Sequence, residues 1–238
     1  MQFKIYYLLE SAPKRLVHSS LTELHLDSSI KKAGWCRRFA CIASILSFLF
    51  VLSGCSDTPE LSLLPPTAKI VAFGDSLTFG TGVDAVDSYP AVLADLSGLN
   101  VVRSGVPGEI SATGLQRLSI VLAEERSHLF VICHGGNDVL RRLSAKKTEQ
   151  NLRTMIALVR ASGAEVVLLA VPKFGLFSTA WDYYEDIAQE LDVPIELDII
   201  SDLQRNPALK SDQVHFNREG YRQMAEAVVN LLKVSGAL

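Results

Sequence analysis

A serine, an aspartate and a histidine in this chain are the residue types that nucleophilic acyl transfer requires. Ser76 stands in the segment Gly74-Asp75-Ser76-Leu77, and Asp212 and His215 stand three residues apart near the carboxyl terminus. In such chemistry the histidine takes the proton of the serine hydroxyl, and the carboxylate holds the imidazole in the tautomer that accepts it. Each segment alone is ordinary turn chemistry, so the hypothesis requires a fold that brings them together.

Acyl transfer also needs hydrogen-bond donors for the negative charge that develops on the carbonyl oxygen. Gly105 can offer an unobstructed backbone N–H, and Asn137 can offer a side-chain amide. Both residue types are also common in plain turns. We therefore treat Gly105 and Asn137 as candidate oxyanion donors whose value depends on their position relative to Ser76.

Short, continuous apolar runs alternate along the chain with segments of helical periodicity. Continuous apolarity is typical of strands buried on both faces, as in parallel sheets. The apolar runs are Ile70–Phe73, Val101-Val102, Leu129–Cys133 and Val166–Val171. Four helices are expected: one that begins after Ser88 as its N-cap, one over Glu149–Ala161, one over Trp181–Leu191 and one after Asn217. This alternation predicts the α/β class, with a parallel sheet covered by helices.

The candidate residues follow the ends of predicted strands. Ser76 comes after the first strand, Gly105 after the second and Asn137 after the third, whereas Asp212 and His215 precede the last helix. Ligand sites of parallel α/β sheets lie beyond the carboxyl ends of the strands. We therefore expect these five residues to meet at one edge of the sheet.

Four segments, in order, resemble the blocks of the SGNH (GDSL) hydrolase superfamily over the whole domain from Lys69 onward. They are Gly74-Asp75-Ser76-Leu77, Gly105, Gly135-Gly136-Asn137-Asp138 and Asp212-Gln213-Val214-His215. The chain looks most similar to the bacterial arylesterase, lysophospholipase and acyl-CoA thioesterase I branch. It departs from many relatives at Arg103-Ser104-Gly105, where they have Asn-Ala/Ser-Gly, and at Pro107-Gly108-Glu109, where Ser-Gly-Asp is frequent.

The resemblance implies a three-layer α/β/α sandwich with a central, mainly parallel sheet, and a serine esterase that forms an acyl-enzyme on Ser76. It implies a catalytic triad of Ser76, Asp212 and His215, and an oxyanion hole made by Ser76, Gly105 and Asn137. It implies no cofactor and no metal, and a small acyl ester or thioester as substrate. We interpret the remaining carboxylates of these blocks, Asp75 and Asp138, as loop-bracing groups.

Two other functions stay open at this point. One is an O-acetyl esterase acting on an envelope polysaccharide, and the other is a non-catalytic lipoprotein that keeps the fold as a binding module. The segment Val171–Thr179 carries Phe174, Leu176 and Phe177, which could line an acyl groove or equally pack against the core.

The amino-terminal region has the features of a secretory signal. An apolar run from Phe39 to Leu52 follows Arg37 and Arg38 and is followed by Ser53-Gly54-Cys55. Because Leu52-Ser53-Gly54-Cys55 resembles a lipoprotein lipobox, it implies cleavage before Cys55 and lipidation of that cysteine. We expect a signal region over 1–54, a flexible tether over 55–67 and a hydrolase domain over 68–238.

These features predict a lipid-anchored protein of the bacterial cell envelope, on the periplasmic face of the outer membrane if the organism is Gram-negative. The alternative is an uncleaved signal anchor in the inner membrane.

Charge and cysteine usage limit the possible partners. Residues 1–55 carry seven Lys/Arg and three Asp/Glu, which leaves 16 of the 23 basic and 23 of the 26 acidic residues for the rest of the chain. A remainder with net charge −7 argues against nucleic acid as a partner. Cys36 and Cys41 lie in the signal region and Cys55 is the expected lipidation site, so only Cys133 remains, in an apolar strand. This predicts a buried thiol and leaves no disulfide framework or metal-binding spacing.

Overall fold

The computed structural model describes residues 58–173 and 179–238. Its centre is a sheet whose neighbouring strands all pair in parallel, in the order β2-β1-β3-β4-β5. The strands are β1 (Lys69–Gly74), β2 (Asn100–Gly105), β3 (Leu129–Cys133), β4 (Glu165–Leu169) and β5 (Ile195–Glu196). The parallel sheet predicted from the continuous apolar runs is confirmed, and every residue of β3 is buried.

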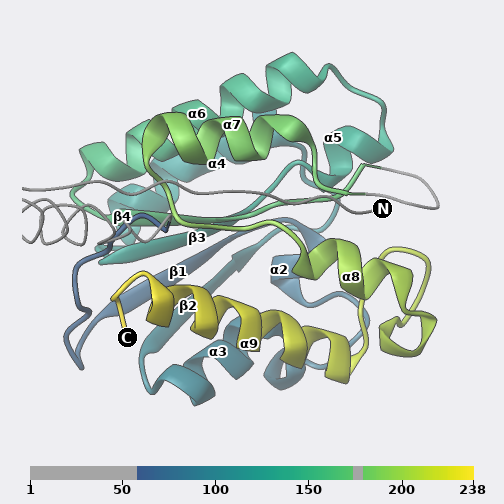
Figure 1. Cartoon of the computed structure of the whole chain (residues 1–238), viewed down its shortest axis with the longest axis horizontal. Coiled ribbons are helices and arrows are strands. Elements are labelled where there is room, and N and C mark those ends of the chain that lie inside the picture. Colours follow the sequence, from purple (N-terminus) through teal and green to yellow (C-terminus); the bar gives the residue numbers. More distant parts are fainter. Residues whose placement is uncertain (1–57, 174–178) are drawn as a thin grey trace, which may run out of the picture. The chain divides into compact units, whose positions relative to one another are not determined.

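Helices cover both faces of the sheet. They are α2 (Ser76–Phe79), α3 (Tyr89–Ser97), α4 (Ser111–Glu124), α5 (Gly136–Leu140), α6 (Ala145–Ala161), α7 (Asp182–Leu191), α8 (Ile199–Arg205) and α9 (Arg218–Val234), with 3₁₀ turns at Ala85–Asp87 and Pro207–Leu209. Figure 1 shows α4, α6 and α7 on one face and α3 and α9 on the other. The three-layer α/β/α architecture is therefore confirmed.

Strand register aligns the loops that carry the candidate residues. Gly74, the last residue of β1, is paired with Gly105 of β2 on one side and with Cys133 of β3 on the other. The three strands therefore end at the same level, and the segments that follow them leave the sheet at one edge. Cys133 is a free, buried thiol, as predicted.

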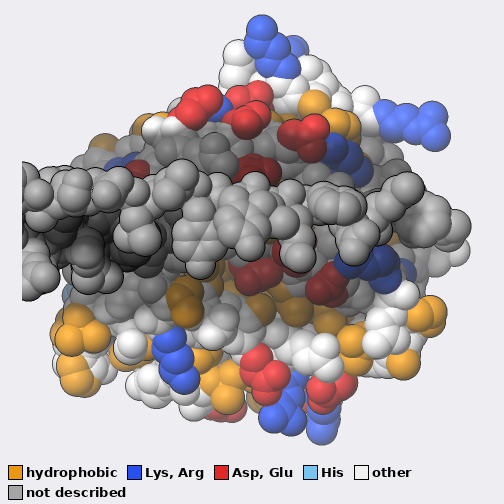
Figure 2. Space-filling view, viewed as in Figure 1, with side chains coloured by type: hydrophobic (Ala, Val, Ile, Leu, Met, Phe, Trp, Pro, Cys, Tyr) orange, Lys and Arg blue, Asp and Glu red, His pale blue; other side chains and the backbone are white. Residues whose placement is uncertain are grey.

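Helix α7 shows why the helices could be predicted from the spacing of apolar residues in the sequence. Tyr183, Tyr184 and Ile187 are buried against the domain, whereas the acidic side chains on the opposite side of the helix are exposed. Figure 2 shows acidic side chains gathered over this helix. One apolar face and one charged face at helical spacing are the pattern of a surface helix.

Several elements differ from the sequence-based expectations. Helix α4 was not predicted, although Leu115, Leu118 and Val121 recur at helical spacing, because Gly114 interrupts its first half. Ser88 occupies the N-cap position of α3 as expected, but its side chain does not cap the helix. Its hydroxyl instead donates to the Ala85 carbonyl at 2.7 Å.

The segment before β1 is partly docked on the domain. The Leu61 N–H donates to the Ser235 carbonyl at 2.8 Å and the Leu64 N–H to the Ala237 carbonyl at 3.0 Å. Leu61 to Leu64 therefore belong to the folded domain, contrary to the flexible tether expected over 55–67. The predicted signal region and Cys55 lie outside the described residues, and no described helix is long and apolar enough to cross a membrane.

Candidate active site

Ser76 is presented at a sharp turn between β1 and α2. Gly74 ends the strand where an added Cβ would lie 2.2 Å from the Cys133 carbonyl oxygen, so the two strands approach more closely than a side chain allows. Asp75 is the N-cap of α2, and its carboxylate accepts from the Leu77 N–H at 3.1 Å. This short helix places Ser76 as its first residue at the carboxyl edge of the sheet.

Ser76, His215 and Asp212 form a continuous hydrogen-bonded chain. The Nε2 atom of His215 lies 3.0 Å from the Ser76 Oγ, and its Nδ1 atom lies 2.7 Å from the Asp212 Oδ2. The other oxygen of Asp212 accepts from the backbone N–H groups of Val214 and His215, both at 2.8 Å. The structure therefore brings together the three residues predicted as a triad, in the connectivity of a Ser-His-Asp arrangement.

The hydrogen bonds around Asp212 keep its carboxylate ionised. Burial raises its pKa, but the bonds from His215 and from the backbone of Val214 outweigh burial and lower the pKa to about 2. An ionised Asp212 accepts a hydrogen bond from Nδ1–H of His215. This tautomer leaves Nε2 without a proton, so Nε2 can accept the proton of the Ser76 hydroxyl.

The loop that carries His215 is held at several points. The Ser211 N–H donates to the His215 carbonyl at 3.0 Å, and the Gln204 side chain donates to the Val214 carbonyl at 2.6 Å. The Lys210 ammonium donates to the Gln213 carbonyl at 2.7 Å. Helix α8, which supplies Gln204, was absent from the sequence-based prediction, so this support for the loop was missed.

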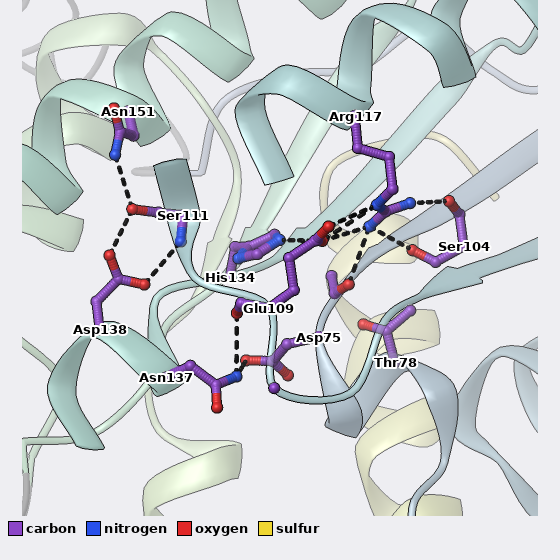
Figure 3. A network of polar contacts seen from close by, with 12 residues as sticks. Asp75, Thr78, Ser104, Glu109, Ser111, Arg117, His134, Asn137, Asp138 and Asn151 are labelled. Atoms are coloured by element: carbon purple, nitrogen blue, oxygen red, sulfur yellow. Dashed lines mark hydrogen bonds and ion pairs between the residues drawn. The ribbon is translucent and has the colours of Figure 1, made fainter. Parts of the chain in front are cut away.

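Asn137 lies beside Asp75 in the first turn of α5, as the strand-end argument predicts. Figure 3 shows its side-chain amide between two acceptors. The Nδ2 atom donates to the Asp75 Oδ2 at 3.1 Å and to the Glu109 carbonyl at 3.0 Å. Both N–H groups of this amide are engaged, so donation to a substrate oxygen requires one of the two bonds to be exchanged.

Gly105 has a packing role at the end of β2. An added Cβ would lie 2.2 Å from the Phe79 nitrogen and 2.7 Å from the Asp75 carbonyl oxygen. The residue is glycine because the backbone of α2 passes directly against it. Ser76, Asn137 and His215 line the cavity described below, but Gly105 does not. Of the predicted oxyanion donors, Gly105 is therefore the one that the structure does not bring to the cavity.

The carboxylate of the third block, Asp138, braces loops, as interpreted from the sequence. Asp138 is buried, and it accepts from the Ser111 N–H at 2.7 Å, the Ser111 hydroxyl at 2.6 Å and the Thr148 hydroxyl at 3.1 Å. It thereby fixes the start of α4 to α5 and α6 (Figure 3). Asp75 is also buried, and burial raises its pKa.

A cavity of about 650 Å³ opens beside Ser76 and His215. Its apolar wall comes from three helices and the segment after β4, and includes Leu77, Leu140, Ile200 and Val171. The described start of the segment Val171–Thr179 thus lines the cavity, whereas Phe174, Leu176 and Phe177 lie outside the described residues. Among the described residues no cluster of three His, Cys, Asp or Glu side chains could hold a metal ion.

A Ser-His-Asp hydrogen-bond chain at the carboxyl edge of a parallel α/β sheet, beside an apolar cavity, defines a serine hydrolase. The sequence matches the GDSL-like lipase/acylhydrolase family over residues 72–223, well over half of the chain. The chain therefore belongs to that family and is an enzyme that hydrolyses ester bonds.

Named relatives and a solved structure agree with this assignment. An esterase TesA of Pseudomonas aeruginosa is 37% identical over 133 residues, which cover 52% of this chain and 66% of that protein. The thioesterase 1/protease 1/lysophospholipase L1 of Escherichia coli is 28% identical over 69% of this chain and 83% of its own length. A crystal structure of TesA superimposes with a TM-score of 0.64 at 27% identity, covering 70% of this chain and 99% of that one.

Proposed function

We propose that this protein hydrolyses carboxylic esters or thioesters through an acyl-enzyme on Ser76, with an arylesterase-, lysophospholipase- or thioesterase-like specificity. The observation that carries the proposal is the contact of the Ser76 Oγ with His215 Nε2 at 3.0 Å, continued to Asp212 at 2.7 Å. That geometry supplies a nucleophile, a base and a group that orients the base.

In the proposed reaction, Ser76 attacks the substrate carbonyl while His215 accepts the hydroxyl proton. The imidazolium then gives this proton to the departing alcohol or thiol, which leaves an ester on Ser76. Water then attacks the ester carbon while His215 takes one of its protons, and the imidazolium returns a proton to the Ser76 oxygen as the acid leaves. Asp212 stays ionised throughout and stabilises the imidazolium.

The oxyanion of each tetrahedral intermediate is bound by Ser76, Asn137 and a backbone N–H of the turn after β2. We assign that N–H to Gly108 in place of Gly105. Among the described residues, no acceptor takes the N–H of Ser76 or the N–H of Gly108. Glu109, directly after Gly108, accepts from the Asn137 amide through its backbone carbonyl. Neither Gly105 nor Gly108 lines the cavity, so the choice of Gly108 rests on its neighbour Glu109, whose carbonyl accepts from the Asn137 amide.

The cavity favours an acyl chain over an acetyl group. A volume of about 650 Å³ with walls from Leu77, Leu140, Val171 and Ile200 can bury several methylene groups, each contributing about 0.8 kcal/mol. Lys210 also lines the cavity, and among the described residues its ammonium contacts only the Gln213 and Gln204 carbonyls, so its positive charge favours substrates with an anionic group such as a lysophospholipid. The name of the Escherichia coli relative includes lysophospholipase L1.

A panel of nitrophenyl esters from acetate to dodecanoate, with lysophospholipid and acyl thioester added, tests the proposal. We expect kcat/KM to rise with chain length beyond acetate in the wild type and to vanish in Ser76→Ala. Activity confined to acetate would favour the alternative O-acetyl esterase acting on an envelope polysaccharide. Equal inertness of wild type and Ser76→Ala across the panel would favour a non-catalytic binding module.

We also propose that the mature protein is anchored to a membrane of the bacterial cell envelope through lipid on Cys55, and that it acts from there on amphiphilic esters. Support comes from the apolar run Phe39–Leu52 followed by Leu52-Ser53-Gly54-Cys55. Several acyl chains on one residue would anchor stably, whereas one chain binds only marginally.

A further inference from the structure

Arg117 contacts three of the segments that surround Ser76. From α4, its guanidinium donates to the Gly74 carbonyl at 3.2 Å, and Gly74 comes two residues before Ser76. It also donates to the Ser104 hydroxyl at 2.7 Å and to the Ser104 carbonyl at 3.3 Å, at the end of β2. Figure 3 shows these contacts converging on one side chain.

The third contact of Arg117 is a forked ion pair with Glu109. Its Nε lies 2.9 Å from one carboxylate oxygen, and its Nη2 lies 2.7 Å from the other. The Glu109 carboxylate is buried, and its second partner is the fully buried His134, whose Nε2 lies 3.1 Å away. Two partners therefore fix the Glu109 side chain from opposite directions.

Glu109 in turn contacts the proposed oxyanion donor. Its backbone carbonyl accepts from the Asn137 amide at 3.0 Å, and this is one of only two acceptors that hold the amide among the described residues. The plane of the Asn137 amide thus depends on where Glu109 lies. A displaced Glu109 would turn the amide, and a misplacement of about 1 Å can cost roughly 100-fold in rate.

We propose that Arg117 is a positioning residue for the oxyanion hole. It holds the carbonyls of Gly74 and Ser104 and the side chain of Glu109 in fixed relative positions, and Glu109 orients Asn137 through its carbonyl. During the reaction Asn137 keeps its bond to Glu109 and exchanges its bond to Asp75 for one to the oxyanion. This inference rests on the proposed roles of Ser76 and Asn137.

A double-mutant cycle on the full chain tests the inference with a short nitrophenyl ester. We expect Asn137→Ala to lower kcat by about 10²–10³ and Arg117→Met to lower it by about 10–100-fold, each with KM little changed. The part of the Arg117 effect that passes through Glu109 and Asn137 is lost in Asn137→Ala, so Arg117→Met should lower kcat by a clearly smaller factor in that variant than in the wild type. Arg117→Lys keeps the positive charge but cannot make the two-point contact with the Glu109 carboxylate, so its kcat should lie between those of the wild type and Arg117→Met.

Arg153→Met is the matched control. Arg153 is similarly half-buried and pairs with Glu149 at 2.9 Å and Glu190 at 2.8 Å, but it lies on α6 away from Ser76, so its loss should leave kcat unchanged. If Arg117→Met fails to fold, the same cycle is run with Glu109→Gln. If the losses in kcat of the two single variants multiply in the double variant, the positioning role of Arg117 is overturned, while the oxyanion role of Asn137 stands. Wild-type kcat in Asn137→Ala would overturn the oxyanion role and the inference with it.

Discussion

The Nε2 atom of His215 lies 3.0 Å from the Oγ of Ser76, although 139 residues separate them in the chain. Contacts next to each residue fix this approach. Phe216, directly after His215, is buried, and the Tyr221 hydroxyl on α9 donates to the Thr81 carbonyl, five residues after Ser76, at 2.9 Å. The site is therefore complete only when α9 packs beside the segment that follows β1.

Replacing Asp212 should impair turnover without destabilising the fold. Asp212→Asn keeps the size of the side chain but favours the wrong imidazole tautomer, so we expect kcat to fall by about 10³–10⁴. Because the side chain is half-exposed, the free energy of unfolding should change by less than about 1 kcal/mol. Steady-state kinetics and urea unfolding measure the two quantities. A kcat above one tenth of the wild-type value would refute the role of Asp212.

Glu109 should make stability depend on pH below about 5. Burial raises its pKa, but the hydrogen bonds from His134 and Arg117 outweigh burial and lower the pKa from 4.5 to about 2. A lowered pKa stabilises the fold at pH values above 4.5, and this contribution is lost as pH falls from 4.5 through 2. The loss should reach about 3 kcal/mol, because one pKa unit corresponds to about 1.4 kcal/mol.

Urea unfolding of wild type and Glu109→Gln at pH 6 and pH 3 measures this contribution. Glutamine takes up no proton, so the free energy of unfolding of the variant should fall less between the two pH values than that of the wild type. Equal decreases in the two proteins would show that the Glu109 carboxylate is not stabilised in this way.

Narrowing the cavity should shorten the preferred acyl chain. Ile200 on α8 is buried but lines the cavity, so Ile200→Phe removes space for the chain and leaves the triad in place. We expect kcat/KM for octanoate to fall about tenfold relative to acetate. Ile199→Phe, on the same helix but not lining the cavity, is the control. An unchanged ratio in Ile200→Phe would place the acyl chain elsewhere.

Cys55 should determine membrane attachment. In a bacterial host, Cys55→Ser should move the protein from the membrane to the soluble fraction, because lipidation is the proposed anchor. Fractionation followed by immunoblotting measures the distribution, with Ser56→Ala as the neighbouring control. Retention of Cys55→Ser in the membrane would support the alternative of an uncleaved signal anchor.

Much of the fold was predictable because β1, β3 and β4 contain continuous apolar runs. Leu129–Cys133 was predicted with both of its bounds, and α7 to within one residue. β5 was not predicted because its two residues give no periodic signal, and α8 was missed because it is only seven residues long. Short elements like these are fixed by tertiary packing, which local patterns do not reveal.

The triad was predictable because its members stand in short segments of characteristic composition. The support around it was not, since it comes from residues that meet only in the folded chain. The contact of Asn137 with Glu109 joins positions 28 residues apart, and the packing of Gly105 against α2 depends on strand register. Gly105 and Gly108 are both turn glycines in sequence, and only the structure separates their environments.

Covalent labelling of Ser76 tests the central claim most directly. A phosphonate that reacts with activated serines is added to the wild type, to Ser76→Ala and to His215→Gln, and the modified peptide is located by mass spectrometry. The account predicts one adduct, on Ser76, formed in step with loss of esterase activity, absent from Ser76→Ala and much slower in His215→Gln. An adduct on another residue, or hydrolysis that persists in Ser76→Ala, would contradict it.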